Sequence, residues 1–180
     1  MEKKTIWDLH RDSLDTYRAK RKLPLVIVLD NIRSLNNIGS IFRTSDAFMV
    51  EEIMLCGITA TPPSAEIHKT ALGAEESVKW SYYADTMQAL AELHARHYTV
   101  CVLEQVKDSI SLERFMPDPA NGYALVLGHE VNGVDPDVVN AADCCIELPQ
   151  YGTKHSLNVA VTAGIAIWHF FSATFLNHKS

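Results

Sequence analysis

The chain has 180 residues, 47% of them apolar, and a formal net charge of −6, values typical of one compact globular domain. Its cysteines have neither paired nor zinc-ligand spacing, which excludes a disulfide-rich scaffold and a zinc module; they are Cys56, Cys101, Cys144 and Cys145. We expect buried free thiols in a reducing compartment, the cytoplasm, with no bound metal. Residues 1–10 are polar, so no signal peptide is expected.

Positive charge is concentrated near the amino terminus. Residues 1–43 contain nine Lys and Arg against five Asp and Glu, although the chain as a whole is acidic. A local basic patch binds phosphates even on an acidic protein. The alternative is a solvated helix face, which charge alone favours, so both interpretations stay open at this point.

In chain order, the first segments alternate between helix and strand. An amphipathic helix is predicted over 5–22, because apolar residues recur at helical spacing and a proline follows. Residues 24–30 form a continuous apolar run rich in β-branched residues, which is typical of a parallel strand buried on both faces. A polar turn then leads to a predicted helix near 38–49 and a second strand over 53–56.

The second half continues this alternation. Short apolar runs predict strands over 98–103, 123–128 and 144–148. Helices are predicted over 85–97, after Pro136 and from Ser156 onward. Asp85 and Asp135 are expected to cap the first two of these helices.

Strands that alternate with helices predict an α/β fold: a mostly parallel sheet with helices on both faces. In such sheets ligands bind beyond the carboxyl ends of the strands. The functional loops are therefore expected to follow residues 30, 103, 128 and 148.

The segment 159–176 contains no Asp, Glu, Lys or Arg and is long enough to span a bilayer. Polar residues interrupt it, and Trp168 lies in its middle rather than at an interface. We therefore interpret it as a buried C-terminal helix of a soluble protein, and expect no membrane contact.

The first of three unusual loops spans 36–48. Gly39 near a helix start is expected to let the backbone approach a ligand closely, and Arg43 lies four residues further, on the same helix face. Such an arginine can grip a phosphate through two hydrogen bonds. The alternative is an Asn-rich helix cap followed by a surface arginine.

The second loop, 125–134, follows an apolar strand that stops at Gly128. His129, Glu130 and Asn132 come next, at the strand end where α/β folds place their sites. Imidazole titrates near neutrality, so His129 is a candidate base, although a histidine in a turn more often forms only a hydrogen bond. The alternative is an ordinary polar turn.

The third loop, 146–161, is shaped by Pro149 and Gly152 and ends at a helix start. Ser156 has a plain interpretation as a helix cap, whereas Asn158 makes better sense if it faces a ligand or another loop. The chain contains no P-loop, dinucleotide-binding, serine-hydrolase or zinc-protease motif, so phosphotransfer, hydride transfer and these hydrolyses lack support.

In this order and spacing, the three loops resemble the motifs of the SpoU (TrmH) family of RNA ribose 2′-O-methyltransferases, part of the SPOUT superfamily. The matching stretches are N-I-G-S-I-F-R, L-G-H-E-V-N-G-V and L-P-Q-Y-G-T-K-H-S-L-N-V. K-T-A-L-G-A-E-E-S-V-K-W at 69–80 also resembles a family segment, and the resemblance covers about residues 24–172. It implies S-adenosylmethionine as cofactor, a homodimer with the active site at its interface, and a deep trefoil knot in the C-terminal part.

The resemblance also implies the site residues. Four are expected to line the cofactor pocket: Glu104, Gly128, Leu148 and Leu157. In the family, the arginine that matches Arg43 is proposed as the base that takes the ribose proton, but arginine keeps its own proton at neutral pH. We therefore expect Arg43 to position the ribose and its phosphate, with orientation supplied by Asn37, Glu130, Ser156 and Asn158.

Two parts are expected: a basic helical extension over 1–23 and a methyltransferase domain over 24–180. We expect no separate RNA-binding domain, so the extension and the dimer surface would bind RNA. The basic residues expected to contact phosphates are Arg11, Arg18, Lys20, Arg21 and Lys22.

The third motif, with Gln150 after Pro149, looks closer to the tRNA-directed branch of the family, so tRNA is the expected substrate. Three alternatives remain: an rRNA methyltransferase, a non-catalytic RNA-binding module of the same fold, and a SPOUT enzyme that methylates a base nitrogen.

Overall fold

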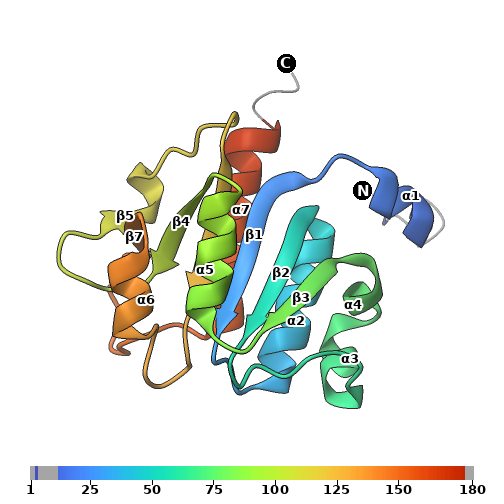
Figure 1. The fold of residues 1–180 in the computed structure, drawn as a ribbon, viewed down its shortest axis with the longest axis horizontal. Helices are drawn as coiled ribbons and strands as arrows, with labels where there is room; N and C mark the ends of the chain where they lie inside the picture. Colours follow the sequence, from blue (N-terminus) through green and yellow to red (C-terminus); the bar gives the residue numbers. More distant parts are fainter. Residues whose placement is uncertain (1–2, 4–11, 177–180) are drawn as a thin grey trace.

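The computed structural model of the chain describes residue 3 and residues 12–176. It contains one seven-stranded sheet with helices on both faces (Figure 1). The strands are β1 (Leu23–Asp30), β2 (Val50–Cys56), β3 (Lys79–Tyr83), β4 (Tyr98–Leu103), β5 (Ile110–Ser111), β6 (Gly122–Leu127) and β7 (Cys144–Glu147). The helices are α1 (Leu14–Ala19), α2 (Leu35–Ala47), α3 (Ala65–Ala71), α4 (Ala74–Ser77), α5 (Thr86–Ala95), α6 (Pro136–Ala141) and α7 (Val159–Phe171), with a 3₁₀ turn at Leu112–Arg114 and a π turn at Ser172–Leu176.

The strands lie in the order β3-β2-β1-β6-β4-β7-β5, and every ladder among the described residues is parallel. In β1, alternate residues face opposite layers: Leu25 and Ile27 belong to one buried cluster, whereas Val26 and Val28 belong to the other. Because both faces are covered, the strand is apolar at successive positions rather than at alternate ones. The predicted α/β fold with a mostly parallel sheet is confirmed.

Two apolar layers hold the helices against the sheet. One layer contains Phe42 of α2, Ile67 of α3 and Phe170 of α7. The other contains Leu93 of α5 and Val138 of α6. Figure 1 shows α5 and α6 on the near face and α2 and α7 on the far face. Helices therefore cover both sides of the sheet, as the sequence predicted.

Gly39 of α2 allows α3 to pack unusually close. A Cβ atom at this position would lie 2.2 Å from Thr70 Oγ1 and 2.3 Å from the carbonyl oxygen of Ile67. The close neighbour of Gly39 is thus a helix, and the expectation of ligand approach there is wrong. The glycine is needed for helix packing.

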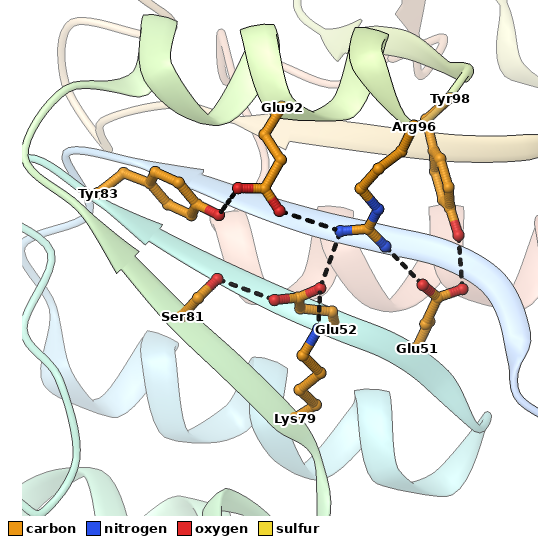
Figure 2. A network of polar contacts seen from close by, with 8 residues as sticks. All are labelled: Glu51, Glu52, Lys79, Ser81, Tyr83, Glu92, Arg96 and Tyr98. Atoms are coloured by element: carbon orange, nitrogen blue, oxygen red, sulfur yellow. Dashed lines mark hydrogen bonds and ion pairs between the residues drawn. The ribbon is translucent and has the colours of Figure 1, made fainter.

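A polar network joins the amino ends of β2 and β3 to the end of α5 (Figure 2). Its centre is Glu52, only 1% exposed, which accepts hydrogen bonds from Lys79 Nζ (2.9 Å), Ser81 Oγ (2.9 Å) and Arg96 Nη1 (3.1 Å). Burial raises the pKa of Glu52, but the hydrogen bonds to its charged form outweigh burial, and the pKa is lowered. This network lies at the opposite end of the strands from their carboxyl ends, so we assign it a structural role.

Several element boundaries differ from the sequence predictions. The first helix covers only Leu14–Ala19 of the predicted 5–22, and residues 4–11 lie outside the described part. The sequence pattern missed β3, α3, α4 and the two-residue strand β5. The edge strand β3 is only half-buried along its length, so it lacks the apolar run that marked the central strands.

The C-terminal helix α7 buries only one face. Ala163, Ile167 and Phe170 lie in the core, whereas Val161 and Trp168 are exposed. Together with the π turn that follows it, the helix is long and apolar enough to cross a membrane by length and composition, and a minority of that segment is buried. The expectation of a buried C-terminal helix therefore holds for one face only. α7 is a core helix with an exposed apolar strip.

The cysteines are free, as expected: Cys56 and Cys101 are buried, and Cys144 and Cys145 are partly buried. Cys101 and Cys144 face each other across β4 and β7, with their sulfur atoms 3.3 Å apart.

Candidate active site

A cavity of about 790 Å³ opens at the carboxyl ends of β4, β6 and β7. Residues from three loops supply most of its lining, at 103–106, 127–134 and 146–158. All four residues expected to surround the cofactor lie on its wall: Glu104, Gly128, Leu148 and Leu157. Of the four loops predicted to be functional, those after residues 103, 128 and 148 converge at this edge of the sheet, and the loop after residue 30 does not line the cavity.

Two glycines let the β6–α6 loop fold back on itself. A Cβ atom on Gly128 would lie 2.2 Å from the backbone nitrogen of Val134, and one on Gly133, where φ is +70°, would lie 2.2 Å from Glu104 Oε2. Glu104 accepts hydrogen bonds from the backbone N–H groups of Gln105 (2.9 Å) and Val134 (3.2 Å). Its carboxylate therefore joins two of the cavity loops through backbone groups.

Asp30 at the end of β1 anchors the same loop, and the sequence analysis missed it. This carboxylate is 2% exposed and accepts hydrogen bonds from Thr86 Oγ1 (2.6 Å), Asn31 Nδ2 (2.9 Å) and the backbone N–H of Asp135 (3.1 Å). An acidic residue that ends a buried apolar strand was the available signal. Asp30 thus fixes the exit of the β6–α6 loop against β1 and α5.

A chain of polar side chains connects the three predicted loops. Glu130 accepts hydrogen bonds from the backbone N–H groups of Arg33 (3.2 Å) and Ser34 (3.0 Å) and from Asn37 Nδ2 (3.1 Å). Asn158 Nδ2 in turn donates to Asn37 Oδ1 (3.0 Å). Residues 37, 130 and 158, far apart in the sequence, are therefore in direct contact within one chain.

The electrostatics make Glu130 an anchor. Burial raises the pKa of Glu130, but hydrogen bonds from its own backbone N–H, from the backbone N–H groups of Arg33 and Ser34 and from Asn37 outweigh burial. The pKa therefore lies below its ordinary value. A carboxylate with a lowered pKa is a weak base, so this geometry suits Glu130 for holding the start of α2.

Asn158, and not Ser156, caps α7. Its Oδ1 accepts hydrogen bonds from the backbone N–H groups of Ala160 (2.9 Å) and Val161 (3.3 Å), and the helix starts at Val159. The interpretation of Ser156 as the cap is wrong. Ser156 is exposed, lines the cavity and makes no hydrogen bond to any described residue, so its hydroxyl is available to a ligand.

His129 lines the cavity but is poorly suited to be a base. Its Nδ1 accepts hydrogen bonds from the backbone N–H groups of Val131 (3.1 Å) and Asn132 (3.2 Å). In the neutral ring, an accepting Nδ1 leaves the proton on Nε2. His129 therefore presents a donor rather than a base.

Arg43 does not reach the cavity of its own chain. It is exposed on α2, is absent from the cavity wall and forms no hydrogen bond or ion pair with the described residues. It follows Asn37 by six residues, which corresponds to about 9 Å along a helix axis and about 120° of rotation. The predicted cluster therefore divides into Asn37, Glu130 and Asn158 on one side and Arg43 on another.

The basic residues of the amino-terminal extension are mostly engaged within the chain. Arg18 Nη2 donates to the carbonyl of Glu76 (2.6 Å), and Lys20 pairs with Asp12 (2.5 Å). Lys22 Nζ lies 3.1 Å from the centroid of the Tyr17 ring. Arg11 lies outside the described residues. Figure 1 shows α1 near the start of β1, whereas the cavity lies at the carboxyl ends of β4, β6 and β7.

Comparison with protein-family models matches residues 24–168 to the SpoU rRNA Methylase family. The chain belongs to this family. The match includes all three motif loops, at 36–48, 125–134 and 146–161, and the resemblance inferred from them is confirmed.

Two curated proteins illustrate the relationship. The chain is 31% identical over 152 residues to a tRNA (guanosine(18)-2′-O)-methyltransferase of Aquifex aeolicus, covering 83% of this chain and 69% of that protein. It is also 31% identical over 151 residues to the 23S rRNA (guanosine-2′-O-)-methyltransferase RlmB of Nitrosomonas europaea, covering 82% of this chain. The chain spans only 55% of the RlmB protein, so that relative contains much sequence outside the match.

Solved structures of SpoU family proteins have the same fold. The TrmH/SpoU tRNA modifying enzyme of A. aeolicus matches with a TM-score of 0.78 at 27% identity, covering 89% of this chain and 81% of that one. The AdoMet-bound rRNA methyltransferase of Sinorhizobium meliloti matches with a TM-score of 0.75 at 25% identity, covering 87% of this chain and 58% of that one.

Proposed function

We propose that this SpoU family chain transfers a methyl group from S-adenosylmethionine to a ribose 2′-hydroxyl of RNA. The observation that carries the proposal is the hydrogen-bonded chain Glu130–Asn37–Asn158 beside the cavity. It joins the three motif loops, all of which lie inside the family match over residues 24–168. A binding module without catalysis would not need the cavity and this chain together.

The cavity fits a cationic cofactor. Its charged wall residues are three glutamates, Glu104, Glu130 and Glu147, and neither lysine nor arginine lies among the described residues of the wall. An acidic cavity favours a sulfonium ion and disfavours a phosphate-bearing nucleotide. Leu103, Leu148 and other apolar residues offer surface for an adenine ring. When bound, the cofactor supplies a methyl group already activated for in-line displacement.

The residues of the chain orient the acceptor. Glu130 and Asn158 fix both ends of the Asn37 amide, so Asn37 presents its remaining donor in one direction. Ser156 contributes a free hydroxyl at the cavity wall. Together they hold a ribose in place, which converts an encounter into an oriented reaction. Arg43 holds the adjacent phosphate and stabilises the charge that develops on the ribose oxygen, whose proton passes to solvent water as the methyl group is transferred.

A homodimer brings Arg43 to the site. Val161, Ile165 and Trp168 form an exposed apolar strip on α7 at helical spacing, and α2 packs beside this helix, with Thr44 near Gly164. Pairing two strips removes apolar surface from water and places Arg43 at the subunit boundary. The knot of the SPOUT fold is part of the same proposal, since the loop after β7 passes the cavity before α7 begins.

For the substrate we propose tRNA, in the cytoplasm. The chain spans more of the tRNA-directed relative than of RlmB, and rRNA remains the second candidate because the identities are equal. Within the basic extension over 1–23, Arg21 is the main expected phosphate contact, because Arg18, Lys20 and Lys22 are engaged within the chain.

The test uses the purified protein with labelled S-adenosylmethionine and bulk tRNA or rRNA from cells that lack the gene. Nucleoside analysis should show a 2′-O-methylated ribose in one RNA class. Arg43→Ala should keep cofactor affinity but lose methyl transfer. Cofactor binding without transfer would favour the RNA-binding module, and a methylated base nitrogen would favour the third alternative.

A further inference from the structure

The two most exposed large apolar side chains among the described residues lie in loops that line the cavity. Tyr151 is 98% exposed and Val131 is 84% exposed. Tyr151 lies in the loop 149–157, next to the cavity-lining residue Gln150, and Val131 lines the cavity itself. Exposed apolar groups on loops that line a cavity indicate a place for a ligand.

Tyr151 differs from the other tyrosines of the chain. The hydroxyl groups of five tyrosines form hydrogen bonds within the protein: Tyr17, Tyr82, Tyr83, Tyr98 and Tyr123. Tyr151 forms neither a hydrogen bond nor a ring contact with any described residue. Its side chain therefore contributes nothing to packing of the chain in which it lies.

The surroundings of Tyr151 suit a nucleic acid. Gly152 follows it, and Lys154 and His155 add a cation and an imidazole in the same exposed loop. The cavity wall is acidic, whereas this rim carries the basic side chain. A ribose that enters the cavity leaves its base and phosphate at the rim. Aromatic rings at such positions stack on unpaired RNA bases.

We propose that Tyr151 stacks on an RNA base at or next to the methylated nucleotide and so positions the ribose. This inference rests on the proposed methyl transfer to RNA. Lys154 would contact the phosphate beside the stacked base. Tyr151 lies eight residues before Val159, outside the apolar strip of α7, so a base is favoured over a second copy of the chain as its partner.

The experiment compares Tyr151→Ala, Tyr151→Phe and the wild-type protein. Met116→Ala is the matched control, because Met116 is also an exposed apolar residue but lies outside the three loops that line the cavity. Three quantities are measured: KM and kcat with bulk tRNA and bulk rRNA from cells that lack the gene, Kd for S-adenosylhomocysteine by calorimetry, and mass in solution by light scattering.

Stacking predicts a KM for RNA that rises roughly 10-fold or more in Tyr151→Ala. The KM of Tyr151→Phe for RNA should stay close to the wild-type value, since the phenylalanine ring stacks as well. The Kd for S-adenosylhomocysteine and the mass should not change, and Met116→Ala should match the wild type.

Each result that contradicts the stacking role points to a different explanation. An unchanged KM in Tyr151→Ala, or a Tyr151→Phe as impaired as Tyr151→Ala, would overturn the stacking role. A weakened Kd for S-adenosylhomocysteine would assign Tyr151 to the cofactor, and a halved mass would assign it to the dimer. If the wild-type protein methylates neither RNA, the proposed function fails together with this inference; if it does and Tyr151→Ala equals it, only the inference fails.

Discussion

Replacing Glu130 with glutamine removes one charge from the centre of the polar chain and keeps the size of the side chain. In the wild-type protein the carboxylate accepts three hydrogen bonds, from Arg33, Ser34 and Asn37. A glutamine amide has one accepting oxygen and one donating nitrogen. If its oxygen keeps the bonds to Ser34 and Asn37, its NH₂ group faces the backbone N–H of Arg33, and that bond is lost.

The magnitude follows from these bonds. A hydrogen bond to a charged group contributes about 1.5–3 kcal/mol and a neutral one about 0.5–1.5 kcal/mol. Because Glu130 is exposed, solvent reduces these differences, and we expect a total loss of about 1–2 kcal/mol. For a domain of this size that is a decrease of about 2–8 °C in Tm. Methyl transfer should fall about 10-fold or more, since the Asn37 amide loses its fixed partner.

The loss should depend on pH. The pKa of Glu130 is lowered in the folded protein, so its stabilisation is complete above the unfolded-state pKa of about 4.3 and disappears as pH falls through the folded value. The difference in Tm between wild type and Glu130→Gln should therefore be large at pH 7 and shrink below about pH 4.

Thermal unfolding followed by circular dichroism at several pH values measures this difference, with Glu66→Gln as the surface control. Glu66 pairs only with Lys69 on the exposed side of α3. An identical Tm and full methyl transfer in Glu130→Gln at pH 7 would refute the anchoring role.

Three further outcomes are expected. Glu52→Gln removes the charge opposite Lys79 and Arg96 at a buried site. The free energy of unfolding, measured in urea at pH 7, should fall by about 3 kcal/mol. This difference should shrink as the pH falls through the lowered pKa of Glu52, because the wild-type carboxylate is then protonated as well. Gly39→Ala should destabilise by about 1–3 kcal/mol in the same assay, because its Cβ would meet α3 and this clash exceeds the gain in helix propensity of about 1 kcal/mol. Trp168→Asp places a charge on the exposed strip of α7 and should halve the mass measured by light scattering; an unchanged mass would exclude this strip as the dimer surface.

The sequence predicted the sheet well because its central strands are buried on both faces. Residues 24–30 carry that signal directly, and β1 occupies Leu23–Asp30. The caps of two helices were also predicted correctly, since Asp85 and Asp135 accept the expected backbone hydrogen bonds. The edge strand β3 and the short helices α3 and α4 were missed, because they are half-exposed or too short for a periodic pattern.

The site was predicted in part. Motif order brought Asn37, Glu130 and Asn158 together correctly, and their contacts follow from the parallel sheet placing its loops at one edge. Two features of the site could not be predicted from the sequence. The position of Asp30 at the end of an apolar strand is visible in the sequence, but its partner, a backbone N–H 105 residues away, is not. The separation of Arg43 from the cavity depends on the rotation of α2, which is set by its packing against α3 at Gly39.

Three carboxylates near the cavity hold the β6–α6 loop in one conformation. The β6–α6 loop contains two glycines and would otherwise be free to move. Asp30, Glu104 and Glu130 hold it by accepting hydrogen bonds mainly from backbone N–H groups, and no lysine or arginine among the described residues pairs with any of them. Their negative charge therefore remains at the site. It attracts a sulfonium ion and repels phosphate, so an RNA backbone must be held from outside the cavity. The arginine on α2 and the basic rim beside Tyr151 are where the chain supplies that positive charge.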